Sequence, residues 1–292
     1  MSVIRREKLI HWLRLIRVPN LFTVPGDSLA GFVLCSGKCS GWVLPGCMVI
    51  SLCLYTAGII TNDYVGMKED SVERGGRPLA CGQISPAAAL TVSVLLILCG
   101  LIGAALLSMQ MLRVAVLLTI LIVVYNAFAK EVFLLGPLFM GLCRGLNLLL
   151  GAAASNACFL SETRILIPVF GMVLFIAAVT FVSRKEAQKK KAGIEAWAPL
   201  VSLVIFYPIF FAMNSETDRF ALVCALLIAG CCVRAARRAQ TESIPPAVGL
   251  MICALPLFQA SLISGLCSLF VPLMLILLMP AALLLGKKFY SS

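Results

Sequence analysis

The chain has 292 residues, of which 61% are hydrophobic and only 13% are charged, and its mean hydropathy is +1.03. Soluble proteins contain about 45–50% apolar and about 25% charged residues, so a water-soluble enzyme, a disordered chain and a small disulfide scaffold are excluded. The net charge is +11. In a multi-pass membrane protein such a surplus reports orientation, and we expect no nucleic-acid partner.

A helix needs about 20 mainly apolar residues to cross a bilayer, and ten stretches of the chain approach that length. In chain order they are 19–36, 42–60, 86–109, 112–129, 132–154, 165–182, 197–213, 220–233, 246–264 and 267–285. Nine spans remain an alternative, because the eighth stretch is short and the last two can form one broken unit. We predict a single integral-membrane domain over 1–292, an all-α polytopic bundle of nine to ten transmembrane helices.

The basic residues are distributed unevenly between the predicted loops. Most of the 24 Lys and Arg residues fall in the N-terminal segment and in every second loop, and the other side receives only Lys38, Arg113, Arg164 and Arg219. By the positive-inside rule this predicts both termini in the cytoplasm and an even number of spans. No cleavage site of small residues follows a short apolar region, so we expect no signal peptide. The predicted location is the cell (inner) membrane.

Polar side chains at membrane depth are costly, and they mark either a site or an internal pairing. In the first predicted helix, Asn20 lies three residues after Arg17 and seven before Asp27. These spacings allow all three side chains to face one interior groove.

The loop after the second predicted helix, residues 62–79, is the richest in polar residues. Asp63, Asp70 and Glu73 are spaced so that they share one side if this segment is helical. Carboxylates beside basic residues suit a hard cation shared with a phosphate, and Mg²⁺ often takes one or two carboxylates plus phosphate oxygens. Arg74 and Arg77 are placed to bind phosphate oxygens directly. The alternative is a solvated loop of mixed charge.

Three later segments continue the pattern. Tyr125 and Lys130 lie at the end of the fourth predicted helix, and the fifth contains Arg144 and Asn147, three residues apart. Arg144 must face a cavity or a partner, and the alternative is an Arg–Asp pair that only holds helices together. Small residues near it permit close helix packing in either case: Gly141, Gly145 and Gly151.

The sixth predicted helix ends in Ser183-Arg184-Lys185-Glu186, followed by three lysines, 189–191. We interpret Arg184 and Glu186 as site residues. The lysine run is better interpreted as surface charge attracted to anionic lipid.

Together these residues resemble a known family. The run Asn62-Asp63…Asp70…Arg77-Pro78-Leu79…Gly82-Gln83-Ile84-Ser85 is similar to the first aspartate-rich motif of the UbiA superfamily of intramembrane prenyltransferases. That motif reads roughly N-D-x-x-D-x-x-x-D, followed by R-P-L-x-x-G-x-I-S. Three further segments fit the family in the same order: Arg17-Val18-Pro19-Asn20, Tyr125…Lys130 and Gly141…Arg144…Asn147…Gly151.

The resemblance implies a helical bundle, usually of nine helices, around a central cavity capped by cytoplasmic loops. It implies that aspartate-rich motifs bind Mg²⁺ and the diphosphate of an isoprenyl donor, and that an acceptor of unknown identity attacks the allylic carbon. It implies catalytic roles for Asp63, Asp70, Lys130 and Arg144. The predicted diphosphate- or substrate-binding residues are Asn20, Asn62, Arg77, Tyr125, Asn147 and Arg184. The predicted metal ligands are Asp63, Asp70, Glu73 and Glu186.

Two departures from the family pattern bear on the function. Gly66 stands where the first motif has its middle Asp, and Ser183-Arg184-Lys185-Glu186 stands where the second motif reads D-x-x-x-D. Cations at Arg184 and Lys185 can hold a diphosphate without a second Mg²⁺. The Ser-Arg-x-Glu form resembles a divergent bacterial branch often met in gene clusters for secondary metabolism.

Two hypotheses therefore stand. The first is a Mg²⁺-dependent prenyltransferase whose partners are an isoprenyl diphosphate, an acceptor and the lipid bilayer. The alternative is a non-catalytic membrane protein of the same family that binds or transports a lipid-linked or phosphorylated metabolite.

Overall fold

The structure is a computed structural model that describes residues 3–36, 41–73, 75–155, 163–184, 191–214 and 218–289. Within these ranges the chain is built from helices, and the only extended pairing is an isolated bridge between Ser264 and Cys267. The helices of the first half are α1 (Val3–Leu15), α2 (Val18–Leu21), α3 (Pro25–Ser36), α4 (Val43–Val65), α5 (Met67–Glu73), α6 (Pro86–Leu107) and α7 (Met109–Ala127). Those of the second half are η1 (Ala129–Glu131), α8 (Leu135–Ala154), α9 (Thr163–Ser183), η3 (Ile194–Trp197), α10 (Ala198–Met213), α11 (Arg219–Thr241), α12 (Ile244–Cys253), α13 (Leu255–Ile263) and α14 (Phe270–Phe289).

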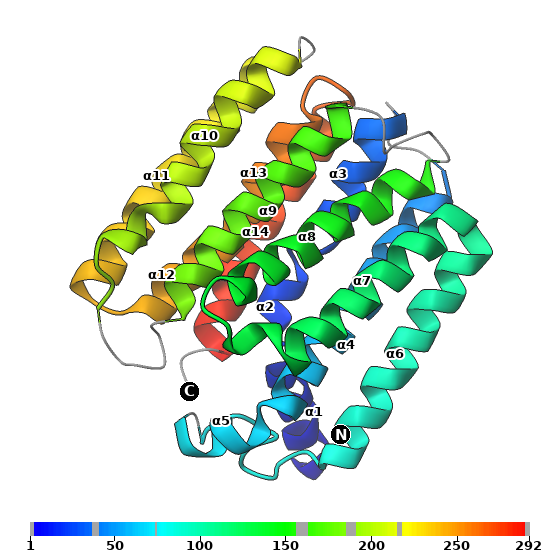
Figure 1. Ribbon diagram of the computed structural model, residues 1–292, viewed down its shortest axis with the longest axis vertical. Coiled ribbons are helices and arrows are strands. Elements are labelled where there is room, and N and C mark those ends of the chain that lie inside the picture. The colour runs from blue at the N-terminus through cyan, green and yellow to red at the C-terminus, as the bar shows by residue number, and fades with distance from the viewer. Residues whose placement is uncertain are drawn as a thin grey trace.

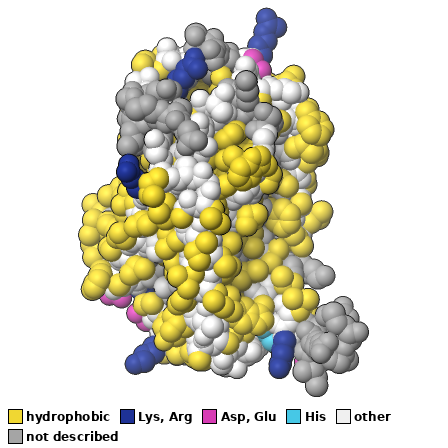
Figure 2. Space-filling view, turned by 90° about the vertical axis from the view of Figure 1, so that its right-hand side faces the viewer, with side chains coloured by type: hydrophobic (Ala, Val, Ile, Leu, Met, Phe, Trp, Pro, Cys, Tyr) yellow, Lys and Arg dark blue, Asp and Glu magenta, His cyan; other side chains and the backbone are white. Residues whose placement is uncertain are grey.

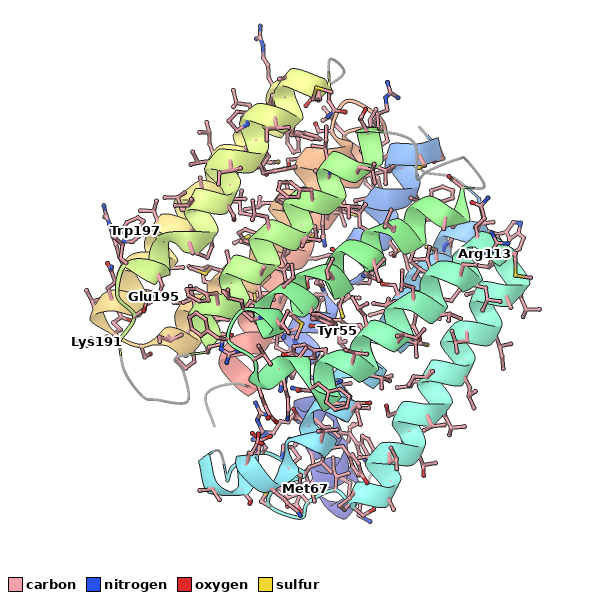
Figure 3. All side chains as sticks on the ribbon, viewed as in Figure 1. Tyr55, Met67, Arg113, Lys191, Glu195 and Trp197 are labelled. Atoms are coloured by element: carbon pink, nitrogen blue, oxygen red, sulfur yellow. The ribbon has the colours of Figure 1, made fainter. Side chains whose placement is uncertain are left out.

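The long helices run beside one another and alternate in direction (Figure 1). Helix α8 lies at the centre, where it packs against α3, α7 and α9. The short helices α1 and α5 lie at one end of the bundle, where α4 ends and α6 begins (Figure 1). We call this the site end. Met67 marks the site end and Arg113 lies near the opposite end (Figure 3).

Every predicted apolar stretch coincides with a helix or a helix pair. Stretch 19–36 forms α2 and α3, and stretch 246–264 forms α12 and α13. In the described part of the chain, eight helical segments are long and apolar enough to cross a membrane, whereas α3 and the apolar segment Phe270–Gly286 of α14 are shorter. The prediction of an all-α membrane bundle is thus confirmed. The predicted count of nine to ten spans is not confirmed by helix length.

The outer surface of the bundle is apolar where it would meet lipid. Large exposed side chains lie on α6, α10 and α11, for example Leu106, Val204 and Leu226. In the space-filling view, apolar side chains dominate the middle, and the Lys and Arg side chains lie mostly toward the two ends (Figure 2). A helix in hydrocarbon satisfies its own backbone hydrogen bonds, so an apolar exterior is what the bilayer requires. The chain is an integral multi-pass membrane protein.

The backbones of α3 and α8 approach closely because both carry glycine at the crossing. A Cβ atom at Gly31 would lie 1.9 Å from the Leu148 carbonyl oxygen, and one at Gly151 would lie 1.8 Å from the Ser28 carbonyl oxygen. This contact brings the start of α3 against α8, and it agrees with the close packing predicted from the small residues near Arg144.

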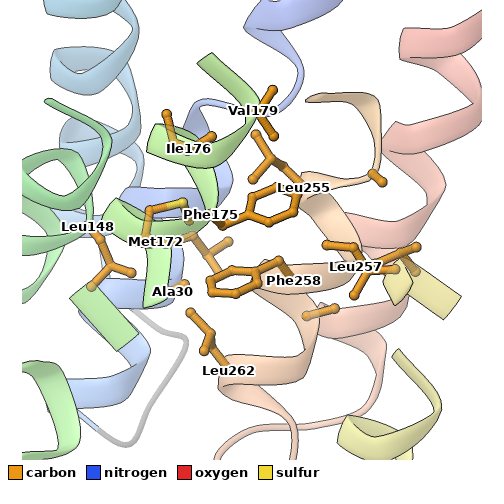
Figure 4. Close-up of a cluster of buried hydrophobic side chains, with 14 of the residues drawn as sticks. Ala30, Leu148, Met172, Phe175, Ile176, Val179, Leu255, Leu257, Phe258 and Leu262 are labelled. Carbon is orange, nitrogen blue, oxygen red and sulfur yellow. The ribbon is translucent and has the colours of Figure 1, made fainter. Parts of the chain in front are cut away.

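The remaining interior is filled by aromatic and aliphatic side chains. Phe175 of α9 stacks on Phe258 of α13, with 6.0 Å between ring centroids (Figure 4). Phe206 of α10 packs against the same Phe258 ring at 5.1 Å. This packing joins the second half of the chain to α3 and α8 in one core. The buried charged side chains Asp27, Asp63, Asp70 and Arg144 lie in two places.

Candidate functional site

Asp63 and Asp70 converge on one guanidinium group at the site end. The Arg77 Nη1 atom donates to Asp63 Oδ1 at 3.1 Å and to Asp70 Oδ2 at 2.5 Å. Arg17 Nη2 donates to the same Asp63 oxygen at 2.7 Å. The side chain of Asp63 is 4% exposed and that of Asp70 is 11% exposed. Two largely buried carboxylates are therefore neutralised by Arg77 from the following loop and by Arg17 from the N-terminal part of the chain.

The local backbone explains why Asp63 and Asp70 face one another. Helix α4 ends at Val65 and is capped by Gly66, whose N–H donates to the Asn62 carbonyl oxygen. The Asp70 N–H donates to the Gly66 carbonyl oxygen. The chain thus continues from α4 into α5 with a change of direction at Gly66. The two aspartates lie on either side of this junction, and both side chains turn toward Arg77.

The loop after α5 directs Arg77 into the site. The Arg77 carbonyl oxygen accepts from the Cys81 N–H, and the Pro78 carbonyl oxygen accepts from the N–H groups of Gln83 and Ile84. Leu79 and Ile84 are buried against Leu15 and Ile60, in a small cluster separate from the main core. The apolar residues of the R-P-L-x-x-G-x-I-S segment therefore anchor a compact turn that holds the Arg77 backbone in place.

Arg17 reaches Asp63 from a strained backbone position. Its φ of 51° and ψ of 58° lie in the left-handed region, which a non-glycine residue occupies at a cost. It precedes the short helix α2, which has proline at its start. The contact with Asp63 is one of the interactions that hold this conformation.

Lys130 adds a third basic side chain beside the carboxylates. Its Nζ atom lies 3.7 Å from Glu69 Oε2, and its side chain is 13% exposed. A Cβ atom at Gly66 would lie 3.6 Å from Lys130 Nζ and 3.5 Å from Asp70 Oδ2. The position where the family motif has an additional Asp is therefore bordered by an ammonium group and a carboxylate.

Tyr125 and Asn126 lie at the end of α7, above the turn that carries Lys130. The Tyr125 side chain lies within electrostatic range of the Arg17 and Arg184 guanidinium groups. Asn126 is buried, its Nδ2 donates to the Gly58 carbonyl oxygen at 3.5 Å, and its Oδ1 has no hydrogen-bond partner among the described residues. The sequence analysis did not single out Asn126, although an amide beside Tyr125 in an apolar helix was a usable signal.

Arg144 and Asn147 belong to a second polar cluster, deeper in the bundle, around Asp27. Arg144 Nε lies 2.9 Å from Asp27 Oδ2, and Asn147 Nδ2 donates to the same oxygen at 3.0 Å. Gln259 Nε2 donates to Asp27 Oδ1 at 2.6 Å. All four side chains are buried, and among the described residues no hydrogen bond or ion pair joins this cluster to Asp63 or Asp70. The Arg144 guanidinium lies 5.6 Å from the centre of the Tyr55 ring, in the middle of the bundle (Figure 3).

Gln259 is the member of this cluster that the sequence analysis missed. The amide side chain inside the apolar stretch 246–264 marks a polar group at membrane depth, but its position in the sequence does not indicate that it binds Asp27. It lies 232 residues from Asp27.

The short helix α2 connects the two clusters. Arg17, just before α2, bonds to Asp63. Thr23, just after α2, has a carbonyl oxygen that accepts from Arg144 Nη2 at 3.2 Å and from Gln259 Nε2 at 2.6 Å. Asn20 lies within α2, is buried, and its carbonyl oxygen accepts from the Thr23 hydroxyl. Packing around Asp27 therefore helps to fix where Arg17 and Asn20 lie.

The remaining predicted residues are placed as follows. Asn62 lies on the last turn of α4, one residue before Asp63, and is partly exposed. The Arg184 guanidinium contacts main-chain carbonyl groups of the turn between α7 and α8. The side chain of Glu73 and the whole of Arg74, Lys185 and Glu186 lie outside the described residues, so the predicted metal roles of Glu73 and Glu186 stay predictions.

The donor set at Asp63 and Asp70 fits a hard divalent cation. Arg77 Nη1 bonds to one oxygen from each carboxylate, so the two oxygens lie close together around a single positive group. Mg²⁺ takes oxygen ligands and is commonly bound by one or two carboxylates plus substrate phosphates and water. No group of three or more His, Cys, Asp or Glu side chains forms a cage within the described ranges.

Comparisons with known sequences identify relatives of this chain. A digeranylgeranylglyceryl phosphate synthase of Methanothrix thermoacetophila is 29% identical over 145 residues, which cover 49% of this chain and 54% of the relative. The chain thus matches about half the length of that relative. A synthase of the same name from Sulfurisphaera tokodaii is 26% identical over 225 residues, which cover 70% of this chain and 80% of the relative.

Two solved structures share the fold. A UbiA homologue from Aeropyrum pernix K1 has a TM-score of 0.69 at 19% identity, covering 84% of this chain and 96% of the homologue. A UbiA homologue from Archaeoglobus fulgidus bound to DMAPP and Mg²⁺ has a TM-score of 0.64 at 18% identity, covering 91% of this chain and 98% of the homologue. The sequence profile of the UbiA prenyltransferase family matches residues 28–265, which is most of the chain. The predicted resemblance is confirmed, and the chain belongs to the UbiA prenyltransferase family.

Proposed function

We propose that this chain is an intramembrane prenyltransferase that moves an isoprenyl group from an allylic diphosphate to an acceptor. The observation that carries the proposal is the convergence of Asp63, Asp70, Arg17 and Arg77 at one end of a membrane bundle. Membership of the UbiA prenyltransferase family supports the same activity. Lys130, beside Gly66 and Asp70, completes the charged group.

The reaction breaks the bond between the allylic carbon and the diphosphate oxygen. Positive charge grows on the carbon and negative charge grows on the departing diphosphate. An electron pair of the acceptor then forms the new bond to carbon, and the acceptor loses a proton. Arg17, Arg77 and Lys130 would stabilise the diphosphate, because fixed cations in a site with little water act most strongly where charge develops. The apolar helices would keep water from the allylic cation.

Asp63 and Asp70 would hold Mg²⁺ in this proposal. A bound Mg²⁺ would supply positive charge beside the leaving diphosphate. Arg77 pairs with both carboxylates, and its guanidinium would also bind phosphate oxygens of the donor. Asn20, Asn62 and Tyr125 would line the diphosphate end of the site. Arg144 and Asn147 would act on it indirectly, through Asp27 and α2, and direct contact of these two with substrate stays a prediction.

Relatives point to the substrates to be tested. UbiA homologues from Archaeoglobus fulgidus were solved with GPP and with DMAPP, each together with Mg²⁺. The sequence relatives are named for a prenylated glyceryl phosphate. A prenylated glyceryl phosphate is therefore the first acceptor to test, and an aromatic acceptor is the second. A role in secondary metabolism stays a prediction.

The site end is proposed to face the cytoplasm of the cell (inner) membrane. Arg77, Lys130 and Arg184 lie at this end, whereas Arg113 lies near the start of α7 and Arg219 starts α11 at the other. Cytoplasmic loops carry the excess of Lys and Arg in membrane proteins. The charged diphosphate of the donor would then reach the site from the cytoplasmic face of the membrane.

The test is turnover by the purified protein in lipid nanodiscs. We expect diphosphate release from dimethylallyl, geranyl, farnesyl or geranylgeranyl diphosphate, dependent on Mg²⁺ and on an acceptor. Asp63→Asn preserves the side-chain shape but removes the charge, and we expect kcat to fall about 10²- to 10³-fold. Glu242→Gln is the matched control, because Glu242 is exposed and, among the described residues, forms an ion pair only with Arg238, at 3.8 Å.

The alternative hypothesis of a carrier makes the opposite forecast. Movement of an intact phosphorylated lipid across proteoliposomes, with no diphosphate released from any donor, would replace the enzyme by the carrier. Equal turnover by the wild type and Asp63→Asn would remove the first aspartate from the mechanism.

A further inference from the structure

Arg184 makes contacts that tie the end of α9 to the turn between α7 and α8. Its Nη1 atom donates to the carbonyl oxygens of Lys130 at 3.1 Å and Val132 at 3.0 Å, and its Nη2 atom donates to that of Glu131 at 3.1 Å. One guanidinium thus binds three consecutive carbonyl groups. Hydrogen bonds from a charged donor are stronger than neutral ones, and the planar fork of Arg suits such a fixed arrangement.

Aromatic packing strengthens the same attachment. The Arg184 guanidinium lies 5.8 Å from the centre of the Phe133 ring, within the range of a cation–π interaction. Phe133 also meets Phe181 of α9 edge to face, with 5.4 Å between ring centroids. Helix α9 therefore holds this turn through two side chains, one turn apart.

Because Gly136 has no side chain, the Arg184 guanidinium has room beside it. A Cβ atom at Gly136, on the first turn of α8, would lie 2.9 Å from Arg184 Nη1 and 3.1 Å from the Lys130 carbonyl oxygen. Any larger side chain there would displace the guanidinium from the carbonyl groups. The absence of a side chain at Gly136 is thus coupled to the position of Arg184.

The residue fixed by this attachment is Lys130. Its carbonyl oxygen is bound by Arg184, while its ammonium group lies 3.7 Å from Glu69 and borders Gly66 and Asp70. Holding a long Lys side chain in one place costs conformational entropy. A fixed backbone at Lys130 lowers the further cost of placing its ammonium group beside the carboxylates.

We propose that Arg184 is a positioning residue that holds the α7–α8 turn so that Lys130 reaches the Asp70 side of the site. This inference rests on the proposed function and deepens it. In this chain the basic residue at the second motif acts through Lys130, and it does so by binding the main chain of the turn. The structure thereby gives a physical role to the departure from the D-x-x-x-D pattern.

The test compares variants that change geometry with a control that changes charge. Arg184→Lys keeps the positive charge but cannot bind three carbonyl groups at once, and Gly136→Ala displaces the Arg184 guanidinium without removing it. Both should lower kcat/KM for the allylic diphosphate by about 10- to 100-fold, because small misplacements of site groups cost this much. Arg237→Gln removes an exposed charge at the same end and should not change kcat/KM.

A double-mutant cycle with Lys130→Met separates positioning from direct binding. If Arg184 acts through Lys130, then Arg184→Lys should cost little further activity once Lys130 is gone. Equal fold-losses in the presence and absence of Lys130 would overturn the proposal.

Chemical labelling provides a readout that needs no turnover. Lys130 is largely buried, so an amine-directed reagent should modify it slowly in the wild type, and several-fold faster in Arg184→Lys and in Gly136→Ala. Mass spectrometry of the folded, monodisperse proteins would measure the rates. Unchanged labelling of Lys130 in both variants would overturn the positioning role. Faster labelling in a protein that turns over no donor would support it while overturning the proposed function.

Discussion

Gly66 is the residue at which this site differs most clearly from the motif it resembles. Its φ of −82° is allowed for any residue, so no backbone strain requires glycine here. The space beside it is bordered by Lys130 and Asp70. The site therefore lacks the middle carboxylate of the motif and keeps the carboxylates of Asp63 and Asp70. Lys130 places a positive charge beside the position that the missing carboxylate would occupy.

We predict that Gly66→Asp lowers the Mg²⁺ concentration needed for half-maximal activity. The new carboxylate would add a hard oxygen ligand next to Asp70, and affinity for such cations rises with the number of charged ligands. The nearest atom, the Asn62 carbonyl oxygen at 3.2 Å from the added Cβ, requires only a small adjustment. Gly66→Asn is the control, because its side chain has the same shape but is not charged. Identical Mg²⁺ dependence of the two variants would contradict the prediction.

At the scale of elements, α2 and the start of α3 join the two polar clusters. The buried Asp27–Arg144 pair holds α3 to α8, and Gln259 adds α13. A buried ion pair contributes little net stability, whereas breaking it by removing one partner leaves an uncompensated charge. We infer that the Asp27–Arg144 pair instead fixes the position of α2, and with it that of Arg17, the residue before α2 that binds Asp63.

We predict that Arg144→Met destabilises the protein by about 3–5 kcal/mol, because Asp27 is left charged and buried. The double variant Asp27→Leu/Arg144→Met should recover most of the loss. Thermal unfolding in detergent would measure both. An equally low melting temperature for the double variant would show that the pair does more than neutralise itself. Activity of the recovered double variant then tests whether Arg144 contacts substrate.

We also predict that Gly151→Ala forces α3 and α8 apart. Its Cβ atom would lie 1.8 Å from the Ser28 carbonyl oxygen, and a rigid backbone atom cannot move aside as a side chain can. Overpacking of this kind costs about 1–3 kcal/mol or more. Gly230→Ala on α11 is the control, because an added Cβ there meets no atom within 4 Å. A melting temperature lowered equally by both substitutions would contradict the close contact.

At the scale of the whole molecule, orientation in the membrane links charge to function. Arg17, Arg77, Lys130 and Arg184 lie at the end where Asp63 and Asp70 lie, and the proposed donor carries a charged diphosphate head. A cytoplasmic site end satisfies both the positive-inside rule and access for the donor.

Cys81 offers a direct check of this orientation. It is an exposed thiol in the loop between α5 and α6, at the site end. We predict that a membrane-impermeant maleimide labels it in inside-out vesicles and not in intact spheroplasts. Cys81→Ser is the control that assigns the label to this residue among the other cysteines. Labelling of Cys81 in intact spheroplasts would reverse the proposed topology.

The membrane class, the ten helical stretches and the first aspartate motif were predictable from the sequence, because each depends on residues close together in the chain. Apolar runs of membrane length form helices in a bilayer whatever lies elsewhere. Asp63 and Asp70 lie seven residues apart, so local spacing predicted that they share one side. Their common contact with Arg77, which was expected to bind phosphate, was not predicted. For Arg144, the sequence analysis also kept open a pairing with an Asp that holds helices together, and the structure shows this pair with Asp27.

Only the tertiary structure decided which distant groups meet. Arg144 and Asn147 gather with Asp27 and Gln259 in one cluster, whereas Arg17 and Arg77 bind the Asp63 and Asp70 carboxylates in another. The contacts of Arg184 with the turn that carries Lys130 were likewise not predicted. Helical spacing says which side chains share a face, but it does not say which face of another helix lies opposite. That is decided by the packing of helices, here by the close crossing of α3 and α8 at Gly31 and Gly151.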